Sequence, residues 1–158
     1  MKYELEDLLR VRNLRKDRAT DALVKAKNAW LEAQKTTEQA SLNLNEFIQK
    51  KPMFIQKVYD KLVKKSQFKR NYLDLTAFKV GKLDEHQSKL AITLKKAQTI
   101  EAEAAKKFEQ CKQELKRATV EMNKIEEHKV TWKNEVNILE QLAQDLELED
   151  FKTKPKDL

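Results

Sequence analysis

The side chains that most often catalyse reactions or bind metals are few and widely separated in this sequence. Its two histidines are His86 and His128, and its one cysteine is Cys111. The stretch EEHKVTW around His128 has no second histidine at helical spacing, so it predicts a surface histidine rather than a metal site. No serine is framed by glycines as in a nucleophile elbow. We therefore expect no enzyme, no cofactor and no metal.

Two other groups of side chains are suited to binding a partner. The first is a run of five cations within nine residues: Arg10, Arg12, Arg15, Lys16 and Arg18. Arginine forms planar, bidentate contacts with acidic and carbonyl groups, so this run suits an acidic protein surface. A solvated first helix with ordinary surface charge explains the same run equally well.

The second group combines aromatic side chains with lysines. Six of the eleven aromatic residues are Phe47, Phe54, Tyr59, Phe68, Tyr72 and Phe78. Residues 50–70 hold eight basic residues against one acid, whereas residues 134–151 hold six acids and no base. Aromatics among lysines suit a protein partner, an anionic lipid surface or single-stranded nucleic acid. The alternative is that these rings pack on each other and cap the end of a hairpin.

The elements that position these groups are predicted to be helices. The chain of 158 residues has one glycine and two prolines, where average usage gives roughly eleven glycines. Charged residues make up 37% of it, as in coiled coils. Sheets with tight turns and phosphate-binding loops need more glycine than this. The predicted fold class is all-α, a long antiparallel two-helix coiled-coil hairpin.

The second half of the chain carries the clearest heptad pattern. Its seam positions, which are apolar apart from one lysine, keep strict four-three spacing. They are Ala104, Phe108, Cys111, Leu115, Ala118, Met122, Ile125, Lys129, Trp132, Val136, Leu139, Ala143 and Leu146. This is a coiled-coil seam of six heptads. Leu90, Leu94 and Ala97 extend it backwards, with Glu101 as a polar interruption.

The first half carries a partner pattern that includes an alanine seam. Leu5, Leu8, Arg12 and Arg15 lead into Ala19, Ala22, Ala26, Ala29 and Ala33, and the pattern continues through Ala40 and Leu44. Alanine opposite a larger side chain lets two helices approach closely without a void. The alternative is that the alanines are simply good helix formers on a poorly packed face.

The reversal between the helices is expected in the polar stretch from residue 64 to 71, because Asn71 followed by Asp74 is a reasonable helix start. Pro52 and Gly81 are the other candidate positions. We expect one elongated hairpin over residues 1–158. Its first helix covers about 3–65 with a kink near Pro52, its turn about 66–71 and its second helix about 72–150, followed by a disordered tail at 151–158.

This reversal predicts which residues face each other. Positions whose numbers add to about 136 lie opposite, so residues 19–33 face Phe108, Cys111 and Leu115, and Trp132 lies close to residue 4. Trp132 is expected to pack in the seam, with a partly uncovered ring as a possible anchor for a partner. The absence of a long apolar run and the single cysteine suggest a cytoplasmic protein.

Two short motifs resemble a known family. The opening YELEDLLRVRNLRKDRATDAL, with Tyr3, Leu5, Leu8, Leu9, Arg12, Asp17, Arg18 and Ala19, is similar to the start of YscO and FliJ proteins of type III secretion. HKVTW, from His128 to Trp132, is similar to their second helix. The resemblance covers nearly the whole chain and is strongest to YscO-like members of virulence secretion systems.

The resemblance implies a central stalk of the secretion ATPase, similar in shape to the gamma subunit of rotary ATPases. The end with the two termini would enter the ATPase hexamer, and the turn would point to the export gate, with export chaperones as further partners. The residues expected to bind the ATPase are Leu5, Leu8, Leu9, Arg12, Arg15, Arg18, Lys129 and Trp132. Those expected to bind the export gate or chaperones are Phe54, Tyr59, Phe68, Tyr72 and Phe78.

A function from another class stays open from the residues alone. The basic stretch at 50–70 would also fit a coiled-coil module that binds nucleic acid or an anionic membrane. Lysines at this density usually solvate a helix face, and no RNA-binding signature accompanies them. We therefore expect no nucleic acid. The resemblance implies a position at the cytoplasmic base of a bacterial secretion apparatus, peripheral to the membrane through partners.

Overall fold

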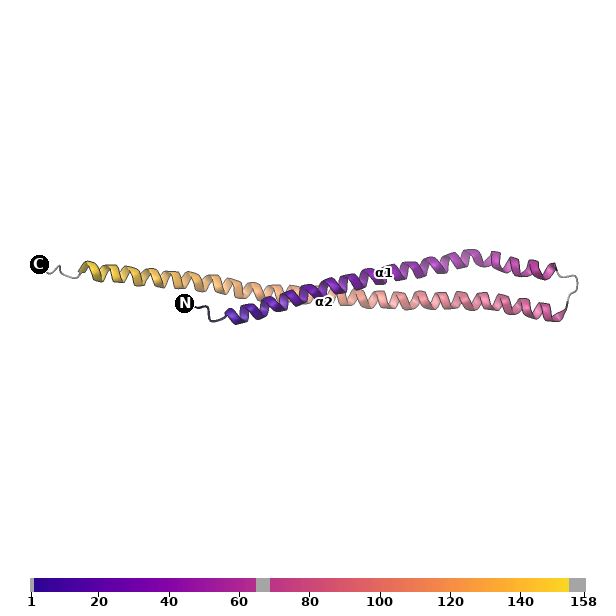
Figure 1. Ribbon diagram of the computed structural model, residues 1–158, viewed down its shortest axis with the longest axis horizontal. Helices are drawn as coiled ribbons and strands as arrows, with labels where there is room; N and C mark the ends of the chain where they lie inside the picture. Colours follow the sequence, from indigo (N-terminus) through magenta and orange to yellow (C-terminus); the bar gives the residue numbers. More distant parts are fainter. Residues whose placement is uncertain (1, 65–68, 154–158) are drawn as a thin grey trace. The chain divides into compact units, whose positions relative to one another are not determined.

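The computed structural model describes residues 2–64 and 69–153, and these residues form two α-helices. Helix α1 is Glu6–Val63, 58 residues long, and α2 is Arg70–Thr153, 84 residues long (Figure 1). The two described ranges contain no strand. The prediction of an all-α, antiparallel two-helix hairpin is confirmed.

The helix boundaries differ from the expected ones by a few residues. Helix α1 runs through Pro52 and stops at Val63, two residues before the expected end. Helix α2 begins at Arg70, so Asn71 lies inside its first turn and is not its cap. The Tyr72 N–H donates to the Lys69 carbonyl at 2.9 Å at this start. The first half of the expected turn, residues 66–68, lies outside the described residues, and residues 70–71 of that turn belong to α2.

The end of α2 also differs from the expectation. The helix extends to Thr153, so residues 151–153, expected in a disordered tail, form its last turn. Lys152 in this turn places a cation where the helix dipole is negative, which favours the helix. The remaining tail residues, 154–158, lie outside the described residues.

Contacts within the chain divide it into two units. Unit 1 joins residues 1–24 with residues 110–158, and unit 2 is the continuous segment Lys25–Glu109. Each unit pairs part of α1 with an antiparallel part of α2 (Figure 1). An antiparallel pair is the expected product of a short connection between two helices with matching apolar stripes.

Unit 2 is held by a seam of small and large side chains. Ala26, Ala33 and Ala40 are buried in α1, and Ala97 is buried in α2. Trp30, half-buried in the same seam, stacks on Phe108 with ring centroids 5.5 Å apart and planes 12° apart. Alternating small and large residues fills the space between the helices without a void.

The alanine seam differs from the prediction in its spacing. Ala22 and Ala29 are exposed, so the prediction that every alanine from Ala19 to Ala33 lies in the seam was wrong. The alanines that face α2 recur every seven residues, and a larger residue takes the other seam position of each heptad. Those larger residues are Leu23, Trp30, Thr37 and Leu44. Burying leucine or tryptophan removes more apolar area from water than burying the adjacent alanine, and this sets the rotation of α1.

The seam of α2 follows the predicted positions as far as Val136. Cys111 and Ile125 are buried, and the other predicted positions from Ala104 to Val136 are half-buried. The expected positions Leu139, Ala143 and Leu146 are instead exposed. The six-heptad seam was therefore predicted too long, because Glu6 at the start of α1 pairs with Lys129 and α1 does not extend beside the last turns of α2.

A pair of substitutions separates the two kinds of alanine. Ala26→Leu should destabilise the protein by about 1–3 kcal/mol, because the added carbons overpack a closed seam. Ala29→Leu adds the same carbons to an exposed position and should change stability by less than about 0.5 kcal/mol. Urea unfolding followed by circular dichroism measures both. A higher midpoint for Ala26→Leu would show that Ala26 has no close partner.

Gly81 offers a stabilising substitution. It lies in the interior of α2, its φ is not positive, and an added Cβ would meet no atom within 4 Å. Gly81→Ala should therefore raise the free energy of unfolding by about 0.5–1 kcal/mol, since alanine loses less backbone entropy in a helix. Thermal unfolding of the variant measures this gain. An unchanged or lower midpoint would mean that the glycine has a packing role.

Candidate partner-binding site

Tyr3 is the centre of a cluster in unit 1 that joins the start of the chain to α2. Its side chain is only 5% exposed. Its ring centroid lies 5.0 Å from that of Trp132, and its hydroxyl lies 2.6 Å from Nδ1 of His128. A buried tyrosine hydroxyl that has a partner avoids the cost of an unsatisfied polar group.

Two charged residues complete this Tyr3 cluster. The Lys129 Nζ lies 2.8 Å from a carboxylate oxygen of Glu6 and 5.8 Å from the Tyr3 ring centroid. The ammonium group thus has an anion and an aromatic face as neighbours, both of which stabilise a cation. Lys129 occupies a seam position of the heptad pattern, and this pair explains how a charge is tolerated there. We define the Tyr3 cluster as Tyr3, Glu6, His128, Lys129 and Trp132.

The start of α1 is fixed by the same residues. The Glu6 N–H donates to the Tyr3 carbonyl at 3.3 Å, and Glu6 and Asp7 place acids in the first turn. Acids there interact favourably with the positive end of the helix dipole. The cluster therefore holds the first turn of α1 on α2 by packing, an ion pair and a hydrogen bond.

Part of this cluster was predicted from the sequence. The expected partner of Trp132 was residue 4, and the structure places its ring on Tyr3, one residue away. Glu6 and His128 were not expected to take part in this cluster. His128 is exposed, as predicted, but its ring also contacts the Tyr3 hydroxyl. The hairpin register was the signal that could have found them, since it brings residues 125–132 opposite the first turn.

The arginines near the N-terminus have different environments. Arg12 is half-buried in the seam, and its Nη1 donates to the Glu121 carbonyl of α2 at 2.8 Å. Arg15 was expected on the seam beside it, but it is exposed, as is Arg18. Lys16 takes the half-buried seam position instead. Arg12 therefore helps to join α1 to α2, whereas Arg15 and Arg18 face solvent.

The expected leucines of this end divide in the same way. Leu5 and Leu9 are half-buried, whereas Leu8 is 38% exposed. Each residue of a helix turns by about 100° from the last, so Leu8 lies on the side away from α2 while Leu5 and Leu9 lie towards it. Unit 1 thus has Leu5, Leu9, Arg12, Lys129 and Trp132 in its seam, and it leaves Leu8, Arg15 and Arg18 outside it.

The aromatic residues of unit 2 form two sets. Phe47 contacts Phe54 with ring centroids 6.2 Å apart and His86 at 4.7 Å, so these rings pack within the unit. Tyr59 and Phe78 are 48% and 61% exposed. Lys82 Nζ lies 5.3 Å from the Phe78 ring centroid. The expected packing therefore holds for Phe47 and Phe54, whereas Tyr59 and Phe78 are exposed.

Two further aromatics were expected in the same binding set. Tyr72 is half-buried in the first turn of α2, and its carbonyl accepts a hydrogen bond from the Thr76 hydroxyl at 2.8 Å. Phe68 lies outside the described residues. The exposed aromatic surface near the turn thus includes Tyr59 and Phe78.

Several lysines of the basic stretch have partners within unit 2. Lys51 Nζ lies 2.5 Å from Asp84 and 2.7 Å from the Gln87 amide oxygen. Lys50 donates a hydrogen bond to Glu46 at 2.6 Å, and this bond lowers the pKa of that carboxyl. Lys57 and Lys61 are exposed. The positive charge of residues 50–70 is therefore partly balanced by nearby carboxylates.

The described surfaces of both helices carry groups that can contact other macromolecules. Among residues 2–64 and 69–153, no three His, Cys, Asp or Glu side chains are placed to hold a metal ion. Neither described helix has a stretch long and apolar enough to cross a bilayer. The exposed cations, aromatics and apolar side chains are groups that recognise other macromolecules.

Substitutions at Tyr3 test how far the Tyr3 cluster acts locally. Tyr3→Ala removes the ring contact and the hydrogen bond, so amide exchange should accelerate in the first two turns of α1 while unit 2 keeps its protection. Tyr3→Phe keeps the ring and should cost about 1 kcal/mol through the lost hydrogen bond. Hydrogen exchange with mass spectrometry measures both. Equal acceleration in unit 2 would contradict a local role.

Comparison with known proteins identifies the family. The family described as Type III secretion protein YscO matches residues 5–154, which include all of α1 and α2. Neither the curated proteins nor the solved structures that were searched give a match. The match extends over both helices, and it confirms the family resemblance. This chain belongs to the YscO family of type III secretion proteins.

Proposed function

We propose that this chain is the stalk that binds a type III secretion ATPase hexamer and links it to the export gate. The family match over residues 5–154 carries the proposal. In this role unit 1 contacts the ATPase, and the turn end of unit 2 contacts the export gate or export chaperones. The protein acts on the cytoplasmic side, is peripheral to the membrane through its partners, and performs no catalysis of its own.

The surface of unit 1 supports the ATPase contact. Arg15 and Arg18 are exposed on α1, and Leu8 offers apolar area beside them. Exposed guanidinium groups suit acidic and carbonyl groups on a partner. The Tyr3 cluster holds the first turn of α1 on α2, so these side chains project from an ordered coil and lose less entropy on binding.

The turn end of unit 2 supports a second contact of a different kind. Tyr59 and Phe78 are exposed, and cations such as Lys61 and Lys82 lie in the same segments. Large aromatic side chains among cations are typical of residues that anchor a protein partner. This surface is our candidate for the export gate or a chaperone.

Binding to nucleic acid or an anionic membrane is the competing function for the same end. The pairing of Lys50 with Glu46 and of Lys51 with Asp84 reduces the charge available to a polyanion. Affinity for a polyanion falls steeply with the logarithm of salt concentration, because counterions are released. Binding to the export gate through aromatic side chains should depend less on salt.

Matched double substitutions test which end binds the ATPase. Arg15→Ala with Arg18→Ala should weaken binding to the hexamer about tenfold, because two charge-assisted contacts are lost. Both side chains are exposed, so helical content should stay nearly constant. Lys57→Ala with Lys61→Ala removes equal charge from the turn end and is the control. Calorimetric titration of the purified hexamer measures the affinities.

The opposite result would reverse the orientation. If the Lys57 and Lys61 variant loses binding to the hexamer while the Arg15 and Arg18 variant keeps it, the turn end of unit 2 is the ATPase contact. If both variants bind as tightly as the original chain, cations at neither end mediate the interaction, and the proposed ATPase contact of unit 1 is wrong.

A further inference from the structure

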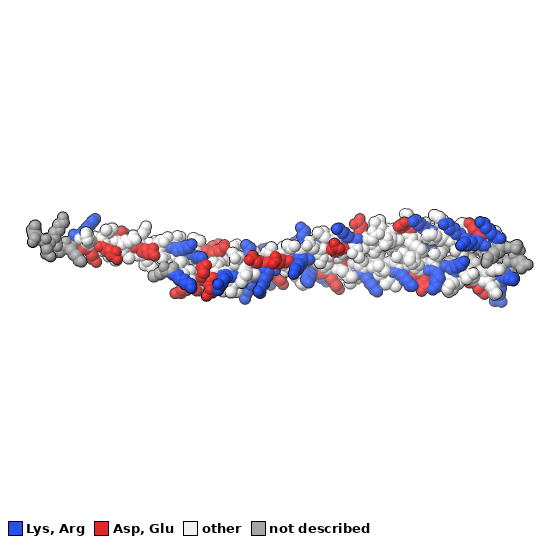
Figure 2. Space-filling model, viewed as in Figure 1, with Lys and Arg blue, Asp and Glu red and all other residues white. Residues whose placement is uncertain are grey.

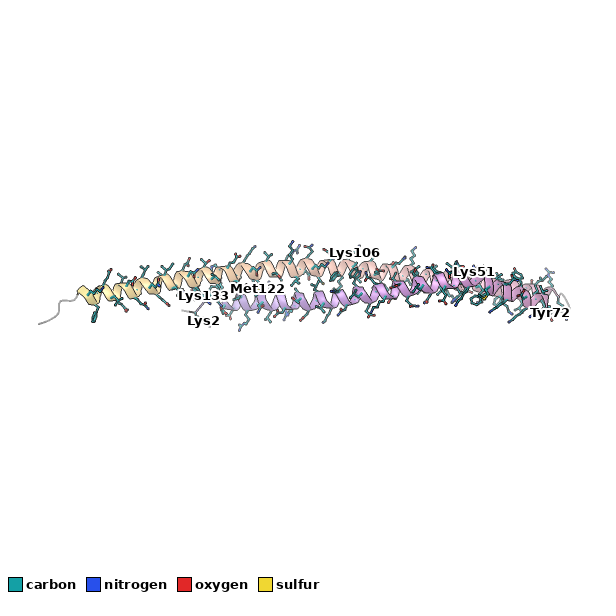
Figure 3. All side chains as sticks on the ribbon, turned by 90° about the horizontal axis from the view of Figure 1, so that it is seen from above. Lys2, Lys51, Tyr72, Lys106, Met122 and Lys133 are labelled. Carbon is teal, nitrogen blue, oxygen red and sulfur yellow. The ribbon has the colours of Figure 1, made fainter. Side chains whose placement is uncertain are left out.

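The C-terminal part of α2 carries an apolar face without a partner among the described residues. We call residues 137–153 the overhang, because Tyr3, just before α1, packs on Trp132 and α1 does not accompany α2 beyond this point (Figure 3). Six large apolar side chains of the overhang are more than half exposed, and four of them share one side of the helix: Ile138, Leu139, Leu142 and Leu146. At 100° per residue they form one stripe about 100° wide.

The stripe continues the seam of unit 1. Trp132, which packs on Tyr3, and Val136 are half-buried, and Leu139 and Leu146 follow them at the same heptad spacing. A sequence that keeps its seam pattern beyond the end of its intramolecular partner is suited to packing another helix. Exposed apolar stripes of this kind mark interaction sites.

The charge of the overhang restricts which helix can cover it. Residues 134–151 contain six acids and no base, and Figure 2 shows acidic side chains along this part of α2. Two overhangs packed on each other would place like charges together, which is unfavourable. The complementary helix therefore has apolar residues accompanied by cations.

The outward side of α1 in unit 1 has this composition. Leu8, Val11 and Leu14 are 38%, 42% and 51% exposed, and Arg15 and Arg18 are exposed beside them. Residues 8, 11, 15 and 18 are spaced by three and four, so they share one face of α1, and that face lies away from α2. We call these five residues the outer face.

We propose that a second copy of this chain is the partner, with each overhang packed on the outer face of the other copy. In this dimer the two copies are antiparallel, and their Tyr3 clusters lie at the same position along the helix axes. Each overhang then lies beside the first turns of α1 of the other copy. The overhang is about 25 Å long at 1.5 Å per residue, and the outer face about 16 Å. Both contacts form together and close the assembly as a two-fold dimer.

Sedimentation equilibrium of the full chain tests the dimer. The expected mass at low salt is twice that of the 18.6 kDa chain, and raising the salt should shift the equilibrium towards the monomer. Leu142→Ala should weaken association about tenfold by removing apolar contact at the middle of the stripe. Leu142 is exposed, so helical content, followed by circular dichroism, should stay unchanged.

Charge reversal gives the sharper test. Because the overhang and the outer face lie on the same chain, one variant can carry reversed charges on both surfaces. Glu140→Lys with Asp145→Lys should weaken the dimer at least tenfold, and so should Arg15→Glu with Arg18→Glu. A chain that carries all four changes restores opposite charges across the interface and should dimerise again. All four residues are exposed, so none of these variants removes a core contact.

Three outcomes would overturn the dimer. The first is the mass of one chain at low salt at every protein concentration, up to 100 times the concentration used in the assay. The second is a dimer that neither charge reversal weakens. The third is a chain with all four charge changes that stays monomeric. A monomer that instead captures another protein through the overhang also excludes the second copy as the occupant.

This inference does not rest on the proposed stalk function. The Glu140 and Asp145 variant keeps every arginine of unit 1, so it should still bind the ATPase hexamer while losing the dimer. A variant that loses the dimer and keeps the ATPase supports the two contacts as separate. Loss of ATPase binding in this variant would instead assign the overhang to the hexamer and count against the dimer.

Discussion

Neither helix of this protein can bury its apolar stripe alone, and the antiparallel seam between α1 and α2 is the constraint on which the rest of the structure depends. A single helix of this composition exposes its leucines and aromatics on every side that lacks a partner. Pairing removes one stripe of each helix from water, and the area removed is the main favourable term. Because the seam is narrow, most other large apolar residues remain at least partly exposed.

Polar residues at seam positions are tolerated because the opposite helix supplies partners. Arg12 donates to the Glu121 carbonyl, Lys129 pairs with Glu6, and Lys51 pairs with Asp84. A half-buried charge without such a partner would cost free energy. These cross-helix pairs also disfavour a shifted register, since a slip by one turn would separate each cation from its partner.

The unequal lengths of the helices determine which surfaces are free to bind partners. Helix α2 is longer than α1, and its final turns therefore project beyond Trp132 with an exposed apolar stripe. The outer face of α1 and the aromatics near the turn are exposed because one seam covers only one side of each helix. A dimer through the overhang would cover Arg15 and Arg18, so the second copy and the ATPase would compete for the same side chains.

The sequence by itself determined the helical class, the course of the α2 seam up to Val136 and the approximate register that brings Trp132 near the start of the chain. Scarce glycine and a strict heptad pattern act locally, so they can be read without coordinates. Only the tertiary structure decided that Ala22 and Ala29 are exposed, that the seam ends at Val136, and that His128 contacts Tyr3. These features depend on the rotation of α1 and on where α1 begins opposite α2, and both are set by packing between residues far apart in the chain.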